Sequence, residues 1–398
     1  MNNQIKANPL DVSFNHWSGV FSITLCVFIL ITSEFMPVSL LTPIASTLQI
    51  TEGMAGQGIA ISGAFAVFTS LFISVIFGNT NRKKVLLILT AIMVLSCAIV
   101  SISVNYFMYM VGRALIGIAI GGFWSMSAAV AMCLVQKKNI SRALAIFNGG
   151  NALAMVIAAP MGAYLETIIG WRATFFSLIP LLMITLFWQW IALPSMPVKT
   201  NTRSVTGAFN VFKLMRRQVV IIGMLAISFL FIGQFTLFTY IRPFLEVVTQ
   251  VNVPTLSYTL LVIGITGFIG TTFINIMLKW GFYTTLIVMP LLMACISVSL
   301  IIFGTKIAIV IVLLAFWGFI ATSIPVGWWA WIPKTFPQEV EVGGGLMVAV
   351  IQLSIALGST VGGILFDSSG YQITFITSAI LLLIAALLAW KLSCVEEK

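Results

Sequence analysis

The segment that decides the fold is SGVFSITLCVFILITSEFMPVSLL, residues 18–41. A helix of about 20 apolar residues crosses the hydrocarbon core of a bilayer, where exposed backbone groups find no partner outside a helix or a closed barrel. The segment therefore predicts a membrane-spanning helix. It contains one acidic side chain, Glu34. A charge at that depth costs about 3 kcal/mol on insertion scales, so Glu34 is a candidate functional residue.

Comparable apolar runs fill the rest of the chain. Of its 398 residues, 60% are hydrophobic and 8% are charged, a composition typical of multi-pass membrane proteins. We therefore predict an all-α membrane protein with twelve transmembrane helices in two pseudo-symmetric six-helix bundles. The expected spans lie near residues 18–41, 54–78, 84–103, 106–134, 142–166, 172–193, 219–241, 256–279, 283–303, 306–332, 343–366 and 371–392.

The positive charges are distributed asymmetrically, and the net charge is +10. With twelve spans, Arg172, Arg242 and Lys306 fall on one side of the membrane, and Arg113 lies inside a span. The other Lys and Arg residues fall on the opposite side. Because cytoplasmic loops carry the excess of these residues, we expect both termini in the cytoplasm. Topology and anionic lipid then explain the charge, and nucleic acid is not an expected partner.

The second half of the sequence repeats features of the first at an offset of about 200 residues. Parallel repeats of this kind occur in transporters that bind substrate between two halves. The matched strings are GAYLE at 162–166 with GILFD at 363–367, GWRATF at 170–175 with GYQITF at 370–375, Glu34-Phe35 with Gln234-Phe235, and Asn151 with Gln352.

This repeat divides the chain into three parts. Residues 1–193 are expected to form an N-terminal six-helix bundle, and residues 219–398 a C-terminal one. Between them, residues 194–218 contain two prolines and several basic residues, and we expect a cytoplasmic linker there.

Arg113 is the predicted counterpart of Glu34. If the N-terminus is inside, span one runs outward and span four runs inward, which puts both side chains roughly 10 Å below the outer surface. They can then meet if the two spans are neighbours. Burial favours the protonated carboxyl group, whereas a nearby guanidinium favours the carboxylate. Glu34 and Arg113 are therefore the candidate proton-coupling residues; a fixed structural ion pair is the alternative.

Polar and aromatic side chains within the spans form the candidate substrate site. Gln234 and Phe238 share a helix face, so one can hydrogen-bond a planar ligand while the other stacks on it. Amides between membrane helices also serve as helix–helix contacts, which is the alternative reading. Tyr240 and Arg242, near the outer end of the same span, are interpreted as interfacial anchors. The candidate substrate-binding residues are Trp124, Asn151, Gln234, Phe238, Trp328 and Gln352.

The sequence predicts no enzyme, cofactor or metal site. His16 is the single histidine and precedes the first span. A phosphate-binding Gly-Lys-Ser/Thr loop is absent from the sequence, which argues against ATP as the energy source. The five cysteines lie in spans or at the cytoplasmic end and show neither a disulfide framework nor metal-ligand spacing.

Motifs in spans four to six follow a known pattern. Arg113, Gly117 and Gly121 recur at steps of four, Gly150 is followed by Pro160, and a Gly-Trp-Arg string begins at Gly170. These motifs resemble those of the major facilitator superfamily, in its branch of twelve-helix drug:proton antiporters. The loop at residues 78–83 departs from the pattern because it lacks the usual Asp.

Longer strings in both halves are similar to the bacterial purine ribonucleoside efflux transporters. The resemblance implies a proton antiporter that exports purine ribonucleosides or similar small polar molecules across the bacterial inner membrane, and we expect it to be a monomer. Related sugar exporters share the Glu-Phe-x-Pro-Val signal, so an arabinose-like sugar exporter, a multidrug exporter and an uncoupled facilitator are the alternatives. A membrane sensor that transports nothing is a further alternative. The similar strings are EFMPVSLLTP at 34–43, GGFWSMSA at 121–128, GQF at 233–235, FTYIRP at 238–243, PVGW at 325–328 and VAVIQL at 348–353.

Overall fold

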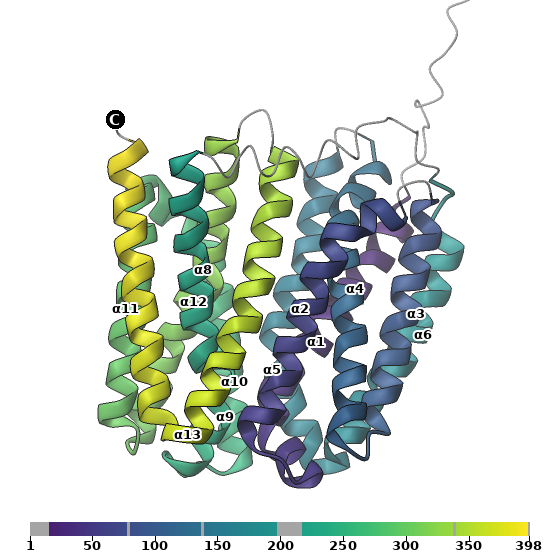
Figure 1. Cartoon of the computed structure of the whole chain (residues 1–398). Coiled ribbons are helices and arrows are strands. Elements are labelled where there is room, and N and C mark those ends of the chain that lie inside the picture. Colours follow the sequence, from purple (N-terminus) through teal and green to yellow (C-terminus); the bar gives the residue numbers. More distant parts are fainter. Residues whose placement is uncertain (1–15, 78–79, 137–138, 197–216, 337–339, 397–398) are drawn as a thin grey trace, which may run out of the picture.

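Long helices make up nearly all of residues 16–77, 80–136, 139–196, 217–336 and 340–396, the residues described by this computed structural model. They run roughly side by side between two ends of one bundle (Figure 1). In chain order they are α1 (Trp17–Leu48), α2 (Glu52–Ile76), α3 (Arg82–Ser101), α4 (Tyr106–Cys133), α5 (Ile140–Phe176), α6 (Leu178–Ala192), α8 (Gln218–Phe238), α9 (Ile241–Val247), α10 (Val253–Trp280), α11 (Phe282–Phe303), α12 (Ile307–Thr335) and α13 (Val340–Glu396).

Ten helical stretches in these ranges are long and apolar enough to cross a membrane. Two of them have 51 and 54 residues, more than a single span needs. Each turns at a glycine with positive φ, 76° at Gly170 and 78° at Gly370, which a residue with a side chain rarely adopts. The expected boundaries between spans five and six and between eleven and twelve lie there. The all-α membrane fold is confirmed, and its helices are consistent with twelve spans.

The backbone also carries the sequence repeat. Gly170 and Gly370 form one matched pair at the predicted offset. Gln49 and Gln250, the non-glycine residues with positive φ among those described, form a second pair at 55° and 56°. Gln49 ends α1 and Gln250 follows α9, so both halves leave their first span through the same left-handed turn.

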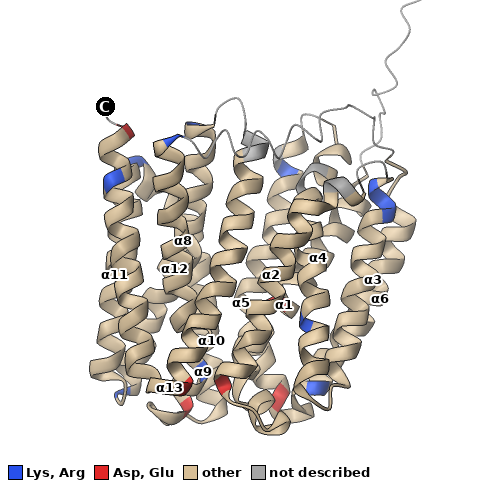
Figure 2. Cartoon of the chain, viewed as in Figure 1, with Lys and Arg blue, Asp and Glu red and all other residues tan. Residues whose placement is uncertain are grey.

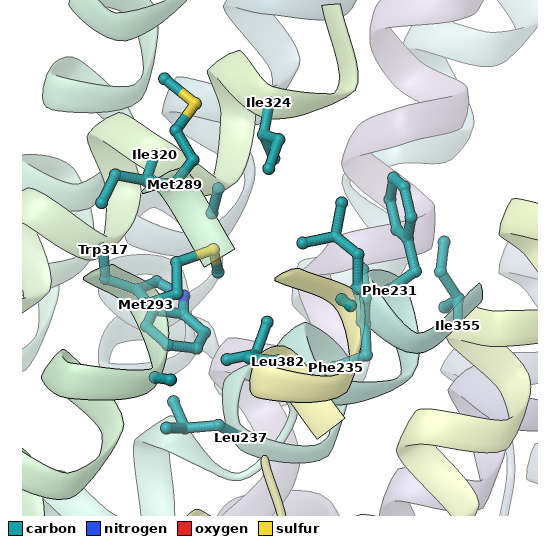
Figure 3. Close-up of a cluster of buried hydrophobic side chains, with 14 of the residues drawn as sticks. Phe231, Phe235, Leu237, Met289, Met293, Trp317, Ile320, Ile324, Ile355 and Leu382 are labelled. Carbon is teal, nitrogen blue, oxygen red and sulfur yellow. The ribbon is translucent and has the colours of Figure 1, made fainter. Parts of the chain in front are cut away.

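Each half has its own apolar core. One buried cluster is drawn mainly from residues 20–193 and the other mainly from residues 220–392. In the second, Trp317 of α12 lies beside Met293 of α11, while Phe231 and Phe235 of α8 lie near Ile355 of α13 (Figure 3). Two cores fit two bundles. The predicted linker, residues 194–218, falls mostly outside the described residues, and the domain boundaries stay a prediction.

Charge separates the two ends of the bundle (Figure 2). One end, where α1 begins and α13 ends, carries most of the described Lys and Arg residues, and we call it the basic end. The opposite end carries four acids, and we call it the acidic end. Those acids are Glu52, Glu166, Glu246 and Asp367. The asymmetry is the one expected from the sequence; the compartment that each end faces stays a prediction.

The first span is longer than expected. Helix α1 continues beyond residue 41 to Leu48. The hydroxyl groups of Ser46 and Thr47 donate to the carbonyl of Pro43, so their hydrogen bonds are made within the helix. Hydropathy alone ends the span too early, at these polar residues. Glu34 therefore lies near the middle of its helix, deeper than the sequence analysis placed it.

Candidate substrate and proton site

A glycine face brings α4 against α2. Added Cβ atoms at Gly117 and Gly121 would overlap the backbone of Ser62 and Ala66, so the two helices are in direct backbone contact. The residues on both helices recur at steps of four, which keeps them on one face. Small residues commonly permit such close contact between membrane helices. The packing directs Arg113, one turn earlier on α4, toward α1 and α2.

Arg113 is buried, with an exposed fraction of 1%, and all its hydrogen bonds hold helices together. Its Nε donates to the carbonyl of Gly58 (3.0 Å), Nη1 to that of Ser33 (2.9 Å), and Nη2 to that of Glu34 (3.1 Å) and to Ser62 Oγ (3.3 Å). The expected meeting of Arg113 and Glu34 thus involves the backbone of Glu34. In the described part of the chain, both ion pairs belong to Arg242, and none joins Arg113 to the Glu34 carboxylate.

A proline explains why Arg113 binds at that point. In an α-helix the carbonyl of residue 33 accepts from the N–H of residue 37, but residue 37 is Pro37, which has no N–H. The Ser33 carbonyl is therefore left without its helical partner inside the membrane, where an unmade hydrogen bond is expensive. Arg113 supplies the missing donor.

The carboxylate of Glu34 faces the other half of the molecule. Its Oε1 accepts a hydrogen bond from Nε2 of Gln352 on α13, at 3.4 Å, and both side chains are buried. The neighbouring Phe35 ring lies 5.9 Å from that of Phe235 on α8. Glu34-Phe35 and the second-half residues Gln352 and Phe235 thus meet where the two bundles join.

Several buried polar atoms near the middle of the second half have no hydrogen-bond partner among the described residues. They include Oε1 of Gln234 and of Gln352, and Nε1 of Trp317 and of Trp328. Leaving such an atom unpaired costs about 1–3 kcal/mol, so each calls for an explanation. A ligand that supplies donors to the amides and acceptors to the indoles is one explanation. The sequence shows Trp317 as one of four tryptophans in the same span, but of these only Trp328 is among the predicted substrate-binding residues.

The remaining candidates are spread along several helices. Trp124 is half-buried on α4 and packs edge-to-face on Phe147 at 6.2 Å, while Asn151 is half-buried on α5. Phe238 packs edge-to-face on Phe235 at 6.1 Å. The structure therefore groups Phe238 with the aromatic side chains beside Glu34. No hydrogen bond or ring contact within the described ranges joins Trp124 or Asn151 to that group.

The two halves are held together from the level of Glu34 to the acidic end. Asp367 of α13 accepts from Thr51 Oγ1 (2.5 Å) and from the Gly53 backbone N–H (2.9 Å), in the first turn of α2. Thr360 Oγ1 donates to Gln57 Oε1 at 3.1 Å. All hydrogen bonds between the halves, as far as the chain is described, lie in this region. The structure is therefore closed at the acidic end.

Arg242 completes this closure, which corrects its interpretation as an interfacial anchor. It is 3% exposed, pairs with Glu166 of the first half (3.3 Å) and with Glu246 of its own helix (2.8 Å), and donates to the Ser39 carbonyl. That carbonyl is the one freed by Pro43, just as Pro37 frees Ser33. The two prolines of α1 were the sequence signal for both arginine sites.

Tyr240 is not an anchor either. Its side chain is fully buried, and its hydroxyl donates to the Ser359 carbonyl at 2.8 Å. It therefore helps to hold α13 against the end of α8.

Removing Arg242 is expected to open the acidic end. In Arg242→Ala, Glu166 and Glu246 lose their partner, and one broken contact of about 1.4 kcal/mol raises the open population about tenfold. A cysteine placed at Thr42 in a cysteine-free background should then react about tenfold faster with a membrane-impermeant maleimide. Arg172→Ala is the matched control, since Arg172 at the same end bonds Ser103 within its own half. Equal labelling rates of the two variants would contradict the role of Arg242 in closing the acidic end.

Comparisons with known proteins give the family. The sequence model described as Major Facilitator Superfamily matches residues 23–359. The chain belongs to the Major Facilitator Superfamily. The expected class, a multi-pass membrane transporter of small molecules and not an enzyme, is thereby confirmed.

Relatives within the Major Facilitator Superfamily cover nearly the whole chain. The protein named transcription regulatory protein OpdE of Pseudomonas aeruginosa is 60% identical over 382 residues, 96% of this chain and 95% of the relative. The purine ribonucleoside efflux pump NepI of Salmonella enteritidis is 38% identical over 372 residues, 94% and 93% of the two chains. A solved bacterial homolog of the human lysosomal transporter Spinster, in an inward-facing and unoccupied conformation, shares the fold with a TM-score of 0.79. Its identity is 13%, and 96% of this chain and 97% of that chain are covered.

Proposed function

We propose that this transporter is a monomeric proton-coupled antiporter that exports purine ribonucleosides or similar small polar molecules. It would lie in the bacterial inner membrane with both termini in the cytoplasm. One observation carries the proposal: a buried carboxylate, Glu34, is hydrogen-bonded to Gln352 of the opposite half. Intramembrane acids are costly and are commonly part of proton or substrate pathways. Because Glu34 joins the halves, a change in its charge alters the contact between them.

The proposed cycle starts with Glu34 ionised and the acidic end closed. Substrate enters from the cytoplasm, and the halves then separate at the acidic end. A proton from the outside neutralises Glu34 as substrate leaves, and the proton is released to the cytoplasm after the return. One charge moving inward through about 100 mV releases roughly 2.3 kcal/mol, which drives export.

The side chains around Glu34 suit a purine ribonucleoside. Phe35, Phe235 and Phe238 offer ring faces and edges, while the unpaired amide oxygens of Gln234 and Gln352 accept hydrogen bonds. A purine nucleoside presents both a planar face and donor groups, a combination that binding sites recognise by stacking and by convergent polar groups. The 38% identity to NepI, named a purine ribonucleoside efflux pump, supports the same substrate class.

Purified protein in liposomes tests this function. In the test vesicles, the basic end of the protein faces the medium that holds the substrate, and the acidic end faces an acidic lumen. Inosine should accumulate in the lumen against its concentration gradient, and arabinose should compete weakly. Inosine equilibration without accumulation would instead favour an uncoupled facilitator. Accumulation of arabinose but not of inosine would favour a sugar exporter.

Trp328→Phe is expected to weaken inosine binding by about 1–2 kcal/mol, or fivefold to thirtyfold, because the ring remains but the unpaired indole N–H is lost. Calorimetry on the purified protein measures it. Trp331→Phe is the matched control, since the Trp331 N–H is already used by Glu396 (3.0 Å). The control should lower the melting temperature and keep inosine affinity. Equal affinities of Trp328→Phe and the parent would remove Trp328 from the substrate site.

A role in transcription is the second candidate, favoured by the name of the relative OpdE, 60% identical. A transporter can influence transcription through the concentration of the solute that it exports. Glu34→Gln separates the two roles, because it stops coupled export in a folded protein. If that variant still restores the transcriptional phenotype of a deletion strain, the regulatory role is independent of transport.

A further inference from the structure

The two amide atoms of Gln352 are in different situations. Nε2 donates to Glu34 Oε1, whereas Oε1 is buried without a partner among the residues described. Gln352 lies on α13 and Glu34 near the middle of α1, so their hydrogen bond joins the two halves. Its side chain therefore has one atom assigned to Glu34 and one atom available to a ligand.

The protonation of Glu34 decides which amide atom it can bind. An ionised carboxylate only accepts hydrogen bonds, so it requires the amide nitrogen of Gln352. A protonated carboxyl group can also donate. Its O–H would satisfy Oε1 of Gln352 if the amide turns by about half a rotation, and the χ3 torsion of glutamine is broad enough to permit this. After the turn, the amide nitrogen points away from Glu34.

We propose that Gln352 reverses its amide when Glu34 gains or loses its proton, and so presents an acceptor to substrate in one state and a donor in the other. This inference rests on the proposed function and identifies the side chain through which proton and substrate exclude each other. With Glu34 ionised, Gln352 offers Oε1 to an N–H or O–H group of the substrate. With Glu34 protonated, it offers Nε2, which repels the same group. Binding of the proton therefore weakens binding of a substrate that donates a hydrogen bond to Gln352. An antiporter requires this opposition between proton and substrate.

Few other titratable groups lie close to Glu34. Arg113 on α4 contacts its backbone, and Cys97 on α3 lies 4.0 Å from Ser33 Oγ. On α9, Arg242 bonds α1 further along, at the Ser39 carbonyl, and Glu166 of α5 pairs with Arg242. On α13, the polar group that bonds Glu34 is the uncharged amide of Gln352. Protonation of Glu34 itself is therefore the local change that Gln352 registers.

The predicted ligand carries a hydrogen-bond donor opposite this amide. The N1–H of a 6-oxopurine nucleoside and the ribose hydroxyls are such donors. 1-Methylinosine, which lacks N1–H, separates the two: tight binding of inosine with weak binding of 1-methylinosine assigns the base, and equal binding assigns the ribose.

The test measures inosine affinity between about pH 5.5 and about pH 8. In the parent, affinity should fall toward acid pH by up to about tenfold per pH unit, because a bound proton excludes substrate. Gln352→Met keeps the length of the side chain and removes both amide atoms. It should bind inosine more weakly at high pH and lose the pH dependence. A variant that keeps the parental pH dependence would overturn the proposal.

Gln234→Met is the matched control. Gln234 is equally buried and also has an unpaired Oε1, but among the described residues the hydrogen bond to the Glu34 carboxylate comes from Gln352 and not from Gln234. This variant should bind inosine more weakly at every pH and retain the pH dependence. If it lost the dependence as Gln352→Met does, the effect would belong to glutamine removal in general, and the specific role of Gln352 would be refuted.

A measurement without substrate separates this proposal from the proposed function. Infrared difference spectra of the parent against Glu34→Gln report the C=O stretch of protonated Glu34. Loss of the Gln352 hydrogen bond in Gln352→Met should raise that frequency, and Gln234→Met should leave it unchanged. An unshifted band overturns the amide contact whatever the substrate. A shifted band with no inosine binding in the parent refutes the nucleoside substrate and supports the contact.

Discussion

Glu34→Gln is expected to abolish proton-driven accumulation of substrate while leaving the protein folded and inserted. The amide keeps the size of the side chain and can still bond Gln352, so the contact between the halves survives. It cannot exchange a proton, and coupling by an intramembrane acid requires that exchange. Counterflow of inosine and pH-driven accumulation, measured in the same vesicles, separate the two properties.

The expected result is that counterflow persists and accumulation against the gradient falls to the background of empty vesicles. Glu52→Gln serves as the matched control, because Glu52 is a partly exposed acid in the first turn of α2, at the acidic end. The control should keep accumulation. If Glu34→Gln still concentrates substrate, Glu34 is not the coupling residue.

Arg113→Ala is expected to cause the largest loss of stability, at least about 3 kcal/mol, because several buried oxygen atoms lose their donor together. The most affected is the Ser33 carbonyl, which Pro37 deprives of its helical partner. Arg113→Lys should recover only part of the loss, since an ammonium group cannot serve four acceptors on two helices as the planar guanidinium does. Thermal unfolding in detergent provides the measurement. A melting temperature of Arg113→Ala equal to that of Arg172→Ala would contradict this.

A double-mutant cycle tests the proline explanation directly. Pro37→Ala restores the N–H that the Ser33 carbonyl lacks, so Arg113→Ala should cost less in the Pro37→Ala background than in the parent. The coupling should be about 1 kcal/mol, the usual value of one hydrogen bond. Additive effects of the two substitutions would show that Arg113 and Pro37 act independently.

Much of the architecture could be predicted from the sequence. Apolar length, the sign of the charges at the span ends and the repeat depend on local properties of the chain, and they predicted the spans and the paired turns at Gly170 and Gly370. The end of α1 was missed, because the hydroxyls of Ser46 and Thr47 satisfy themselves inside the helix. Hydropathy counts such residues as polar wherever their hydrogen bonds go.

The candidate site could be predicted in its residues but not in its contacts. Glu34, Arg113 and Gln352 are conspicuous in sequence, because amides and charges are expensive in a membrane. Arg242 was assigned to the membrane–water interface, because a position near the end of a span suits an interfacial anchor as well as a buried ion pair between the halves. Which partner each group takes depends on the helix that packs beside it.

By itself, the sequence determined that the chain spans the membrane in two similar halves, with one acid and one arginine within the spans. Only the tertiary structure decided that Arg113 binds the carbonyl freed by Pro37, that Arg242 binds the one freed by Pro43, and that the Glu34 carboxylate turns to Gln352. The physical reason is that hydrophobic burial depends on composition and is nearly non-directional, whereas a hydrogen bond needs a donor and an acceptor within about 3 Å. Residues far apart in the chain reach that distance only after the helices have packed.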